Sequence, residues 1–303
     1  MVTEKAYHGN MTPLEEYPRL AETLGLKGLY FKREDLHPYG SHKGRSIPVM
    51  IDLYRRKGDS HFAISSSGNA ALAAALYIIE LNGNEKAGLD LDIFVGNHIA
   101  PKKLEKLQTI ADDAGDDSIR ILKKERPLQA LTQAVAEGKR GLRQSNDETA
   151  LIGYGSLAEE LEAAPSVKAV FLAASSGTTA EALAGHFLKE NKSIQVHIVQ
   201  TSSCHPMADD FENYDGPEEE SIADAIVDRT AIRKPVLVPL LKKSGGWAWV
   251  ASNEDIISAQ KIVKEKTDLD ISTNSALSVV GAMQAVYRGW EIDGAVVCLI
   301  CGD

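Results

Sequence analysis

Residues 29–46 read LYFKREDLHPYGSHKGRS. The apolar start of this stretch predicts a strand, residues 38–41 predict a turn, and a helical pattern begins after Lys43. A lysine at such a junction is expected to point into a cleft. Taken alone, however, a lysine that ends a loop is more often a solvated surface residue. The other motifs of the chain therefore decide what Lys43 does.

Short apolar runs alternate with longer amphipathic stretches along most of the chain. This alternation predicts the α/β class with a mainly parallel sheet, and the nearly continuous apolar character of the runs is typical of strands covered by helices on both faces. We expect two α/β units: a large domain of residues 1–44 plus 151–303, and a small domain of residues 45–150. The predicted strands cover residues 61–65, 91–96, 167–173 and 194–200, and the predicted helices cover residues 68–83, 101–115 and 178–191.

The composition restricts the classes of partner. With 303 residues, 44% of them hydrophobic, the chain can bury a sizeable core. Its formal net charge of -10 and the lack of a basic stripe argue against nucleic acid as a partner. Since the sequence has no apolar run long enough for a membrane span and no secretion signal, we expect a cytoplasmic protein that does not bind membranes. The acidic residues 209–220 are expected to form a surface loop or a lid.

Two predicted helices begin with many hydrogen-bond donors. Residues 64–81 read ISSSGNAALAAALYIIEL, so the donors of Ser66 and Ser67, with Gly68, precede an Ala-rich helix that starts near Asn69. Free backbone amides and the helix dipole suit a carboxylate at such a place, although an ordinary serine cap would give the same pattern.

The second donor-rich start follows a predicted strand, in residues 167–187, VKAVFLAASSGTTAEALAGHF. Gly177 would let the backbone approach an anion closely. The loop suits a phosphate, although a simple capped helix can share the pattern. The residues that would face this phosphate are Ser175, Ser176, Gly177, Thr178 and Thr179.

The chain closes with GAVVCLICGD, which predicts a buried strand that ends at a site near Cys301. Cys298 and Cys301 lie three positions apart, on opposite faces of a strand, so neither a metal pair nor a disulfide is expected between them. We expect no metal site.

In this order, the motifs resemble those of the fold type II family of pyridoxal 5'-phosphate (PLP) enzymes, which includes threonine synthase, serine and threonine dehydratases and the tryptophan synthase β subunit. The lysine stretch is similar to the threonine synthase pattern K-x-E-D-x-x-P-x-G-S-x-K-x-R. The matching residues are Lys32, Glu34, Asp35, Pro38, Gly40, Ser41, Lys43 and Arg45. Two departures are visible: the phosphate loop has one glycine where relatives often have three, and Gly44 replaces a common acidic residue.

The resemblance implies two three-layer α/β/α domains with the PLP cofactor in the cleft between them. It implies a Schiff base between PLP and Lys43, which would also act as the catalytic base. The substrate carboxylate would bind at Ser66, Ser67 and Gly68, and Asn69 would lie beside the ring hydroxyl of PLP. The resemblance further implies a homodimer.

The same resemblance assigns the remaining cofactor contacts. Residues 175–179 would hold the PLP phosphate, and Cys301 would face the pyridine nitrogen, where a neutral partner favours elimination over transamination. His42 and Arg45 could meet an anionic leaving group of the amino-acid substrate, although His42 could equally be a packing residue.

Three functions remain open at this point. The first is a threonine synthase-like lyase that converts O-phosphohomoserine to threonine and phosphate, which the lysine motif favours. The second is a serine or threonine dehydratase, which Cys301 favours. The third is a non-catalytic ligand-binding protein with the same fold, since fold does not fix function.

Overall fold

The computed structural model describes residues 11–115, 117–217 and 219–302. The chain divides into two compact units. Unit 1 contains the described residues up to His37 and from Tyr154 onward, and unit 2 contains Pro38–Gly153. The expected boundary after residue 44 placed Lys43 in the large domain, whereas the structure places it in unit 2. The reason is that its helix, α2 (Lys43–Arg55), packs on α3 (Asn69–Glu85) and α6 (Thr149–Gly153) of that unit.

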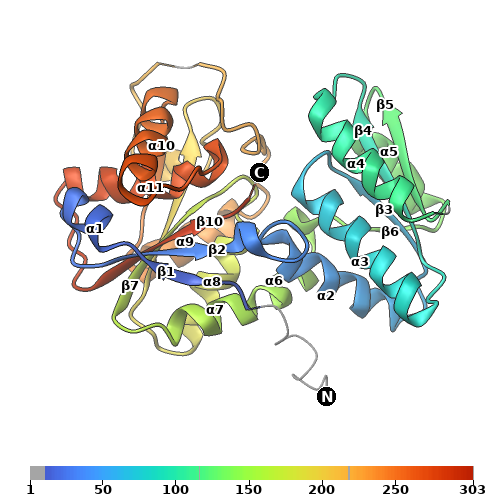
Figure 1. The fold of residues 1–303 in the computed structure, drawn as a ribbon, viewed down its shortest axis with the longest axis horizontal. Coiled ribbons are helices and arrows are strands. Elements are labelled where there is room, and N and C mark those ends of the chain that lie inside the picture. Colours follow the sequence, from blue (N-terminus) through green and yellow to red (C-terminus); the bar gives the residue numbers. More distant parts are fainter. Residues whose placement is uncertain (1–10, 116, 218, 303) are drawn as a thin grey trace. The chain divides into compact units, whose positions relative to one another are not determined.

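Unit 1 is built on a mixed sheet that, within the described residues, has six strands in the order β1-β2-β10-β7-β8-β9 (Figure 1). Among the described residues, β1 pairs with β2 in the antiparallel sense, and the other neighbouring strands of this sheet pair in the parallel sense. The strands are β1 (Leu14–Glu16), β2 (Leu29–Arg33), β7 (Val167–Ala173), β8 (Gln195–Thr201), β9 (Ala248–Ala251) and β10 (Ala295–Ile300).

Helices cover both faces of the unit 1 sheet. One face packs on α1 (Pro18–Leu24), α10 (Asn253–Thr267) and α11 (Thr273–Tyr287). The other face packs on α7 (Gly155–Glu162), α8 (Thr178–Lys189) and α9 (Lys234–Ser244). Short turns η2 (Glu34–Leu36) and η4 (Ala208–Asp210) complete the unit. Successive side chains of β10 enter the two cores in turn, because neighbouring side chains of a strand point to opposite faces.

Unit 2 has a parallel sheet that, among its described residues, contains four strands in the order β5-β4-β3-β6. Helices α2, α3 and α4 share one hydrophobic core, and α5 packs on the opposite face of the sheet. The elements are β3 (His61–Ser65), α3 (Asn69–Glu85), β4 (Asp90–Gly96), α4 (Pro101–Asp113), β5 (Ile119–Lys124), α5 (Pro127–Ala136), β6 (Arg140–Gly141), η3 (Gln144–Asn146) and α6 (Thr149–Gly153).

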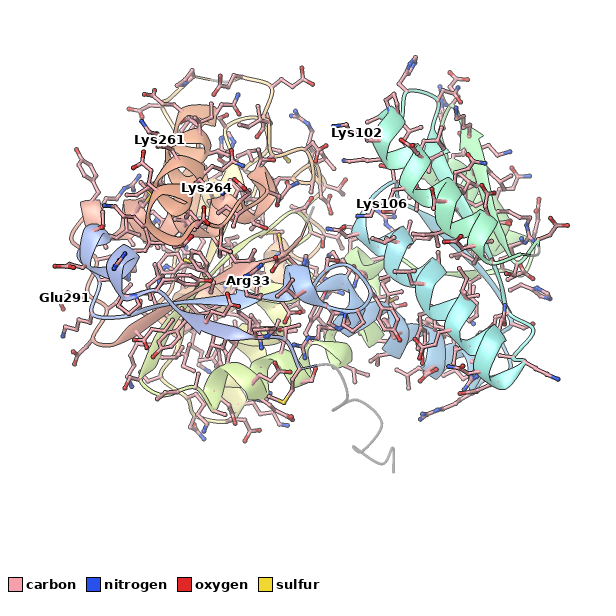
Figure 2. The ribbon with its side chains drawn as sticks, viewed as in Figure 1. Arg33, Lys102, Lys106, Lys261, Lys264 and Glu291 are labelled. Carbon is pink, nitrogen blue, oxygen red and sulfur yellow. The ribbon has the colours of Figure 1, made fainter. Side chains whose placement is uncertain are left out.

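The predicted α/β class with two three-layer units is confirmed. The strand HFAIS and the strand VKAVFLA have the predicted bounds, and the other predicted strands and helices agree to within two residues at most ends. Polar side chains lie on the outer faces of the helices: Lys102 and Lys106 extend from α4, and Lys261 and Lys264 extend from α10 (Figure 2). No described helix has the length and apolar character needed to cross a bilayer.

An aromatic cluster surrounds His197 in the core of unit 1. The His197 ring stacks on Phe171 of the neighbouring strand, with 4.3 Å between ring centroids. The Nε1–H of Trp249 donates to its Nδ1 at 3.2 Å, and its Nε2 lies 3.0 Å from Oε1 of Gln195. Trp290 donates to the same Gln195 oxygen at 3.1 Å. Since Nδ1 accepts a hydrogen bond, the ring is neutral with its proton on Nε2.

Candidate active site

The structure separates the lysine motif at the boundary between the two units. Lys32 is 2% exposed, and its Nζ donates to the carbonyl oxygen of Thr12 and to Glu160. The fully buried Glu34 accepts from Thr12 Oγ1 at 2.5 Å. The first half of the motif therefore ties β2 to α7 within unit 1, because a buried charge needs an opposite partner.

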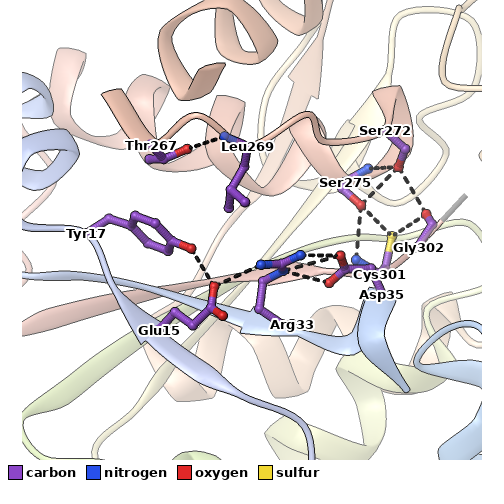
Figure 3. A network of polar contacts seen from close by, with 10 residues as sticks. All are labelled: Glu15, Tyr17, Arg33, Asp35, Thr267, Leu269, Ser272, Ser275, Cys301 and Gly302. Carbon is purple, nitrogen blue, oxygen red and sulfur yellow. Dashed lines mark hydrogen bonds and ion pairs between the residues drawn. The ribbon is translucent and has the colours of Figure 1, made fainter. Parts of the chain in front are cut away.

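Arg33 belongs to a second network on the same strand. It donates to Glu15 Oε2 at 2.9 Å and to Asp35 Oδ2 at 2.8 Å, and Glu15 also accepts from the hydroxyl of Tyr17 (Figure 3). Asp35 of the motif therefore supports η2, the turn that ends just before the chain leaves unit 1. These contacts are structural.

The second half of the motif positions Lys43 in unit 2. Lys43 is the first residue of α2, and its amide donates to Oγ of the buried Ser41 at 3.2 Å. Its side chain is half-buried, and Nζ forms no hydrogen bond or ion pair with any described residue. A half-buried amine without a partner is available to a ligand.

The loop before Lys43 packs against the start of α3. Gly40 has φ +80°, and a Cβ there would lie 2.7 Å from Leu72 Cδ2. Tyr39 is buried, and its hydroxyl donates to Glu80 Oε2 at 2.6 Å. The loop before Lys43 therefore packs on the helix that the serine-rich motif begins.

That motif occupies the turn between β3 and α3. Gly68 is the N-cap of α3, and no side chain caps the helix, so amides of its first turn are available to an anion. Ser66 Oγ accepts from the Gly68 amide at 3.3 Å, which fixes the turn. Ser67 and Asn69 are half-buried beside it.

The predicted phosphate loop lies at the carboxyl end of β7 in unit 1. Gly177 has φ +80°, and a Cβ there would lie 2.5 Å from Leu237 Cδ2 and 3.0 Å from Met207 Cε, so a side chain does not fit. Gly177 is the N-cap of α8, which also lacks a side-chain cap. Ser176 Oγ and Thr178 Oγ1 are 2.9 Å apart, and Thr179 is buried in the first turn.

Two groups near this loop were not identified from the sequence. Glu181 lies in the first turn of α8, where its charge would repel a phosphate, but Arg233 Nη1 pairs with it at 3.0 Å, and both side chains are buried. Arg233 lies outside every motif described above, so the sequence gives no signal of this pairing. The pair keeps the helix start suitable for an anion.

Cys301 follows β10 and is 6% exposed. Its amide donates to Ser275 Oγ at 3.1 Å, and its Sγ lies 3.8 Å from the same oxygen (Figure 3). Ser272 caps α11, and its hydroxyl also donates to the Gly302 carbonyl at 3.0 Å. Ser272 and Ser275 were missed, although the sequence STNS at 272–275 is a recognisable helix start.

The substrate-side candidates Arg45 and His42 flank Lys43. Arg45 is buried and His42 is half-buried, and both make interactions within the described chain. Free Cys204, Cys298 and Cys301 are all buried, and none is in a disulfide among the described residues.

Comparison with known proteins identifies the family of the chain. The profile of the family "Pyridoxal-phosphate dependent enzyme" matches residues 5–302. The chain belongs to this family. Its cofactor is PLP, and its fold is that of fold type II.

Sequence relatives include the threonine synthases of Methanosarcina acetivorans and Mycobacterium leprae, each 26% identical over 96% of this chain and covering 74% and 81% of those proteins. A structure of PLP-dependent aspartate racemase superposes with a TM-score of 0.80 at 20% identity, covering 96% of this chain and 90% of that one. Threonine deaminase isoform 2 of Solanum lycopersicum gives 0.77 at 19% identity, covering 98% and 85%. At such identities the structures show the shared fold alone.

The residues present fit this cofactor. PLP has an aldehyde, a phosphate and a ring nitrogen, and this chain offers an unpartnered lysine amine, a helix start at Gly177 that no side chain caps, and a thiol in contact with a serine hydroxyl. The groups are divided between the two units: Lys43 and Asn69 belong to unit 2, and the loop and Cys301 belong to unit 1.

Proposed function

We propose that the chain is a PLP-dependent lyase of the threonine synthase type, which takes O-phosphohomoserine to threonine and phosphate. The observation that carries the proposal is the unpartnered, half-buried Nζ of Lys43 at the end of a threonine synthase-like motif. The relatives named threonine synthase, which align with 96% of the chain, support the choice of reaction.

Lys43 is proposed to hold the cofactor and to move the proton of the substrate. When bound, PLP supplies an electron sink for the pair left at the substrate α-carbon. The Lys43 amine accepts the α-proton at Nζ in its neutral form. Its backbone is fixed through Ser41, so the amine approaches from a defined direction.

The start of α3 is proposed to orient the substrate. The amides of its first turn and the hydroxyls of Ser66 and Ser67 donate to the α-carboxylate, while Gly68 allows a close approach. Asn69 would lie beside the ring hydroxyl of bound PLP. Residues 175–179 would hold the cofactor phosphate, and the neutral Cys301 thiol would be the partner of the ring nitrogen.

Release of an anionic leaving group needs positive charge nearby. We place His42 and Arg45 in this role because they flank Lys43. The guanidinium of Arg45 is buried, so it would act on a leaving phosphate by its charge rather than by direct contact. His42 is half-buried and can reach a ligand.

A serine or threonine dehydratase is the second candidate. Cys301 favours it, and the L-serine dehydratase/L-threonine deaminase of Bos taurus is 27% identical over 118 residues. The two candidates differ in their products: the first releases inorganic phosphate, and the second releases ammonia and a 2-oxo acid.

The visible absorbance of purified protein with added PLP, before and after borohydride reduction, tests the proposal. We expect an absorbance above 400 nm that reduction removes, with the cofactor mass then fixed to the peptide that contains Lys43. Lys43→Ala should show neither. O-phosphohomoserine, serine and threonine are then assayed for phosphate and 2-oxo acid. A wild-type protein that stays colourless would favour a ligand-binding role.

We further propose that the protein acts as a cytoplasmic homodimer. Light scattering of the PLP-loaded protein should give twice the mass of the chain. A monomer at micromolar concentration would contradict this.

A further inference from the structure

Unit 1 contains a cavity of about 720 Å³ that the proposed chemistry does not use. It lies where the chain leaves β8, and its lining comes from two segments, residues 202–209 and residues 219–229. Cys204, Ala223 and Ile226 form its apolar wall, and these three side chains are buried. The volume suits a small organic molecule.

Two polar atoms of the lining lack partners among the described residues. Ser202 is 1% exposed, and its Oγ is buried without a hydrogen bond. Nδ1 of His205 is likewise buried and unpaired. Since buried polar groups are nearly always satisfied in folded proteins, both atoms need a partner from outside the described residues, which a polar ligand can supply.

The charges on the lining have both signs. Arg229 forms no ion pair within the described chain. Among the acids, Glu219 accepts from the Asn253 amide, Asp224 accepts from Asn274, and Asp209 lies 3.5 Å from Nε2 of His205, which leaves Glu220 to face a ligand. None of the described acidic side chains converges with others as metal ligands do. A small zwitterion satisfies this pattern, with its carboxylate toward Arg229 and its ammonium toward Glu220.

The outer wall of the cavity is bonded to the cofactor side of unit 1. The amides of Val227 and Asp228 both donate to Oγ of Ser175 at 3.1 Å, so the first residue of the phosphate loop holds this wall. The Ala225 amide donates to Asn274, the neighbour of the serine that holds Cys301. A change in residues 225–228 therefore reaches both cofactor contacts.

We propose that this cavity binds a free α-amino acid as an effector, and that its occupancy is coupled to cofactor binding through Ser175. Because coupling is reciprocal, bound cofactor must change the affinity of the cavity by the same factor.

Equilibrium dialysis with labelled L-threonine, L-serine, L-aspartate and L-lysine tests binding. The protein is the PLP-loaded form after borohydride reduction, in which the fixed cofactor cannot exchange with an added amino acid. We expect one saturable site, and affinity about tenfold or more weaker in Arg229→Gln, since a charge-assisted bond is lost. Arg19→Gln, which changes an exposed arginine elsewhere in unit 1, should bind as the wild type does.

Two analogues of threonine test the zwitterion directly. 1-Amino-2-propanol lacks the carboxylate and 3-hydroxybutyrate lacks the ammonium, so both should bind at least tenfold more weakly than the best amino acid. Absence of saturable binding for all four amino acids overturns the proposal, as does equal binding to Arg229→Gln.

Coupling is measured by comparing the dissociation constant in reduced PLP-loaded protein with that in cofactor-free protein. We expect a difference of roughly fivefold or more, the usual lower range for coupled sites. In Ser175→Ala the two constants should become equal. Equal constants in the wild type would refute the coupling. If the protein does not take up PLP, the proposed function fails, and dialysis of the untreated protein still decides whether the cavity binds an amino acid.

Discussion

His197 is neutral because it is buried among aromatic rings. Burial lowers its pKa to about 3, against about 6.5 for an exposed histidine. As the pH falls, the unfolded chain takes up the proton first, so stability is unaffected above about pH 6.5 and is lost from there toward pH 3. Between pH 7 and pH 5 this residue should lower the free energy of unfolding of unit 1 by about 2 kcal/mol.

Urea unfolding followed by near-ultraviolet circular dichroism at pH 7 and pH 5 checks this expectation. His197→Asn keeps an acceptor for Trp249 and removes the titrating group, so its stability should depend less on pH. If both proteins lost the same free energy, the neutral histidine would not be the source of the acid sensitivity.

Gly177 is a second position where one residue decides a property. Gly177→Ala forces a side chain into left-handed backbone and against Leu237 and Met207. We expect a loss of about 1–2 kcal/mol in unfolding free energy and PLP binding weakened by roughly tenfold. Gly185→Ala in the same helix meets open space and should be neutral or stabilising. PLP titration and urea unfolding measure both; unchanged PLP affinity in Gly177→Ala would speak against the loop as the phosphate site.

At the scale of elements, the position of α2 depends on its close packing with α6. A Cβ on Gly153 would lie 2.2 Å from the Arg45 carbonyl oxygen and 2.5 Å from Ser46 Cα. Gly153→Ala should therefore move the helix that carries Lys43, with a stability loss of about 1–3 kcal/mol and reduced PLP uptake. Gly155→Ala, with nothing within 4 Å, is the matched control. Thermal unfolding with and without PLP compares them, and equal behaviour of the two variants would contradict the packing argument.

The elements show which features a sequence can predict. Strands β3 and β7 were predicted because their apolar runs are bounded by clear turns. The donor-rich starts of α3 and α8 were visible for the same local reason. The Glu181–Arg233 pair and the hydrogen bond from the Cys301 amide to Ser275 join residues that are far apart in the chain, and no local pattern encodes such contacts. The boundary at Pro38 was missed because the lysine motif runs through it without a change in composition.

At the scale of the whole molecule, unit 2 is one continuous segment with its own sheet and core. A fragment of residues 38–153 should therefore fold alone, with a free energy of unfolding of roughly 5 kcal/mol. Far-ultraviolet circular dichroism should give mixed α/β content and a cooperative urea transition. A fragment that lacked such a transition would show that unit 2 depends on unit 1. The fragment contains Lys43, and it should not retain PLP with the affinity of the full chain, because residues 175–179 and Cys301 belong to unit 1.

The aromatic cluster around His197 has a practical consequence. The three tryptophans of the chain, Trp247, Trp249 and Trp290, lie in this cluster, with ring centroids 5.2–6.3 Å apart. Excitation near 295 nm therefore yields tryptophan emission from unit 1 alone. Unfolding of unit 2 does not change the environment of any tryptophan of its own. Tyrosine emission, by contrast, comes from both units. The intact chain thus carries a natural optical label on one of its halves, and the order in which the halves unfold can be followed without adding a dye.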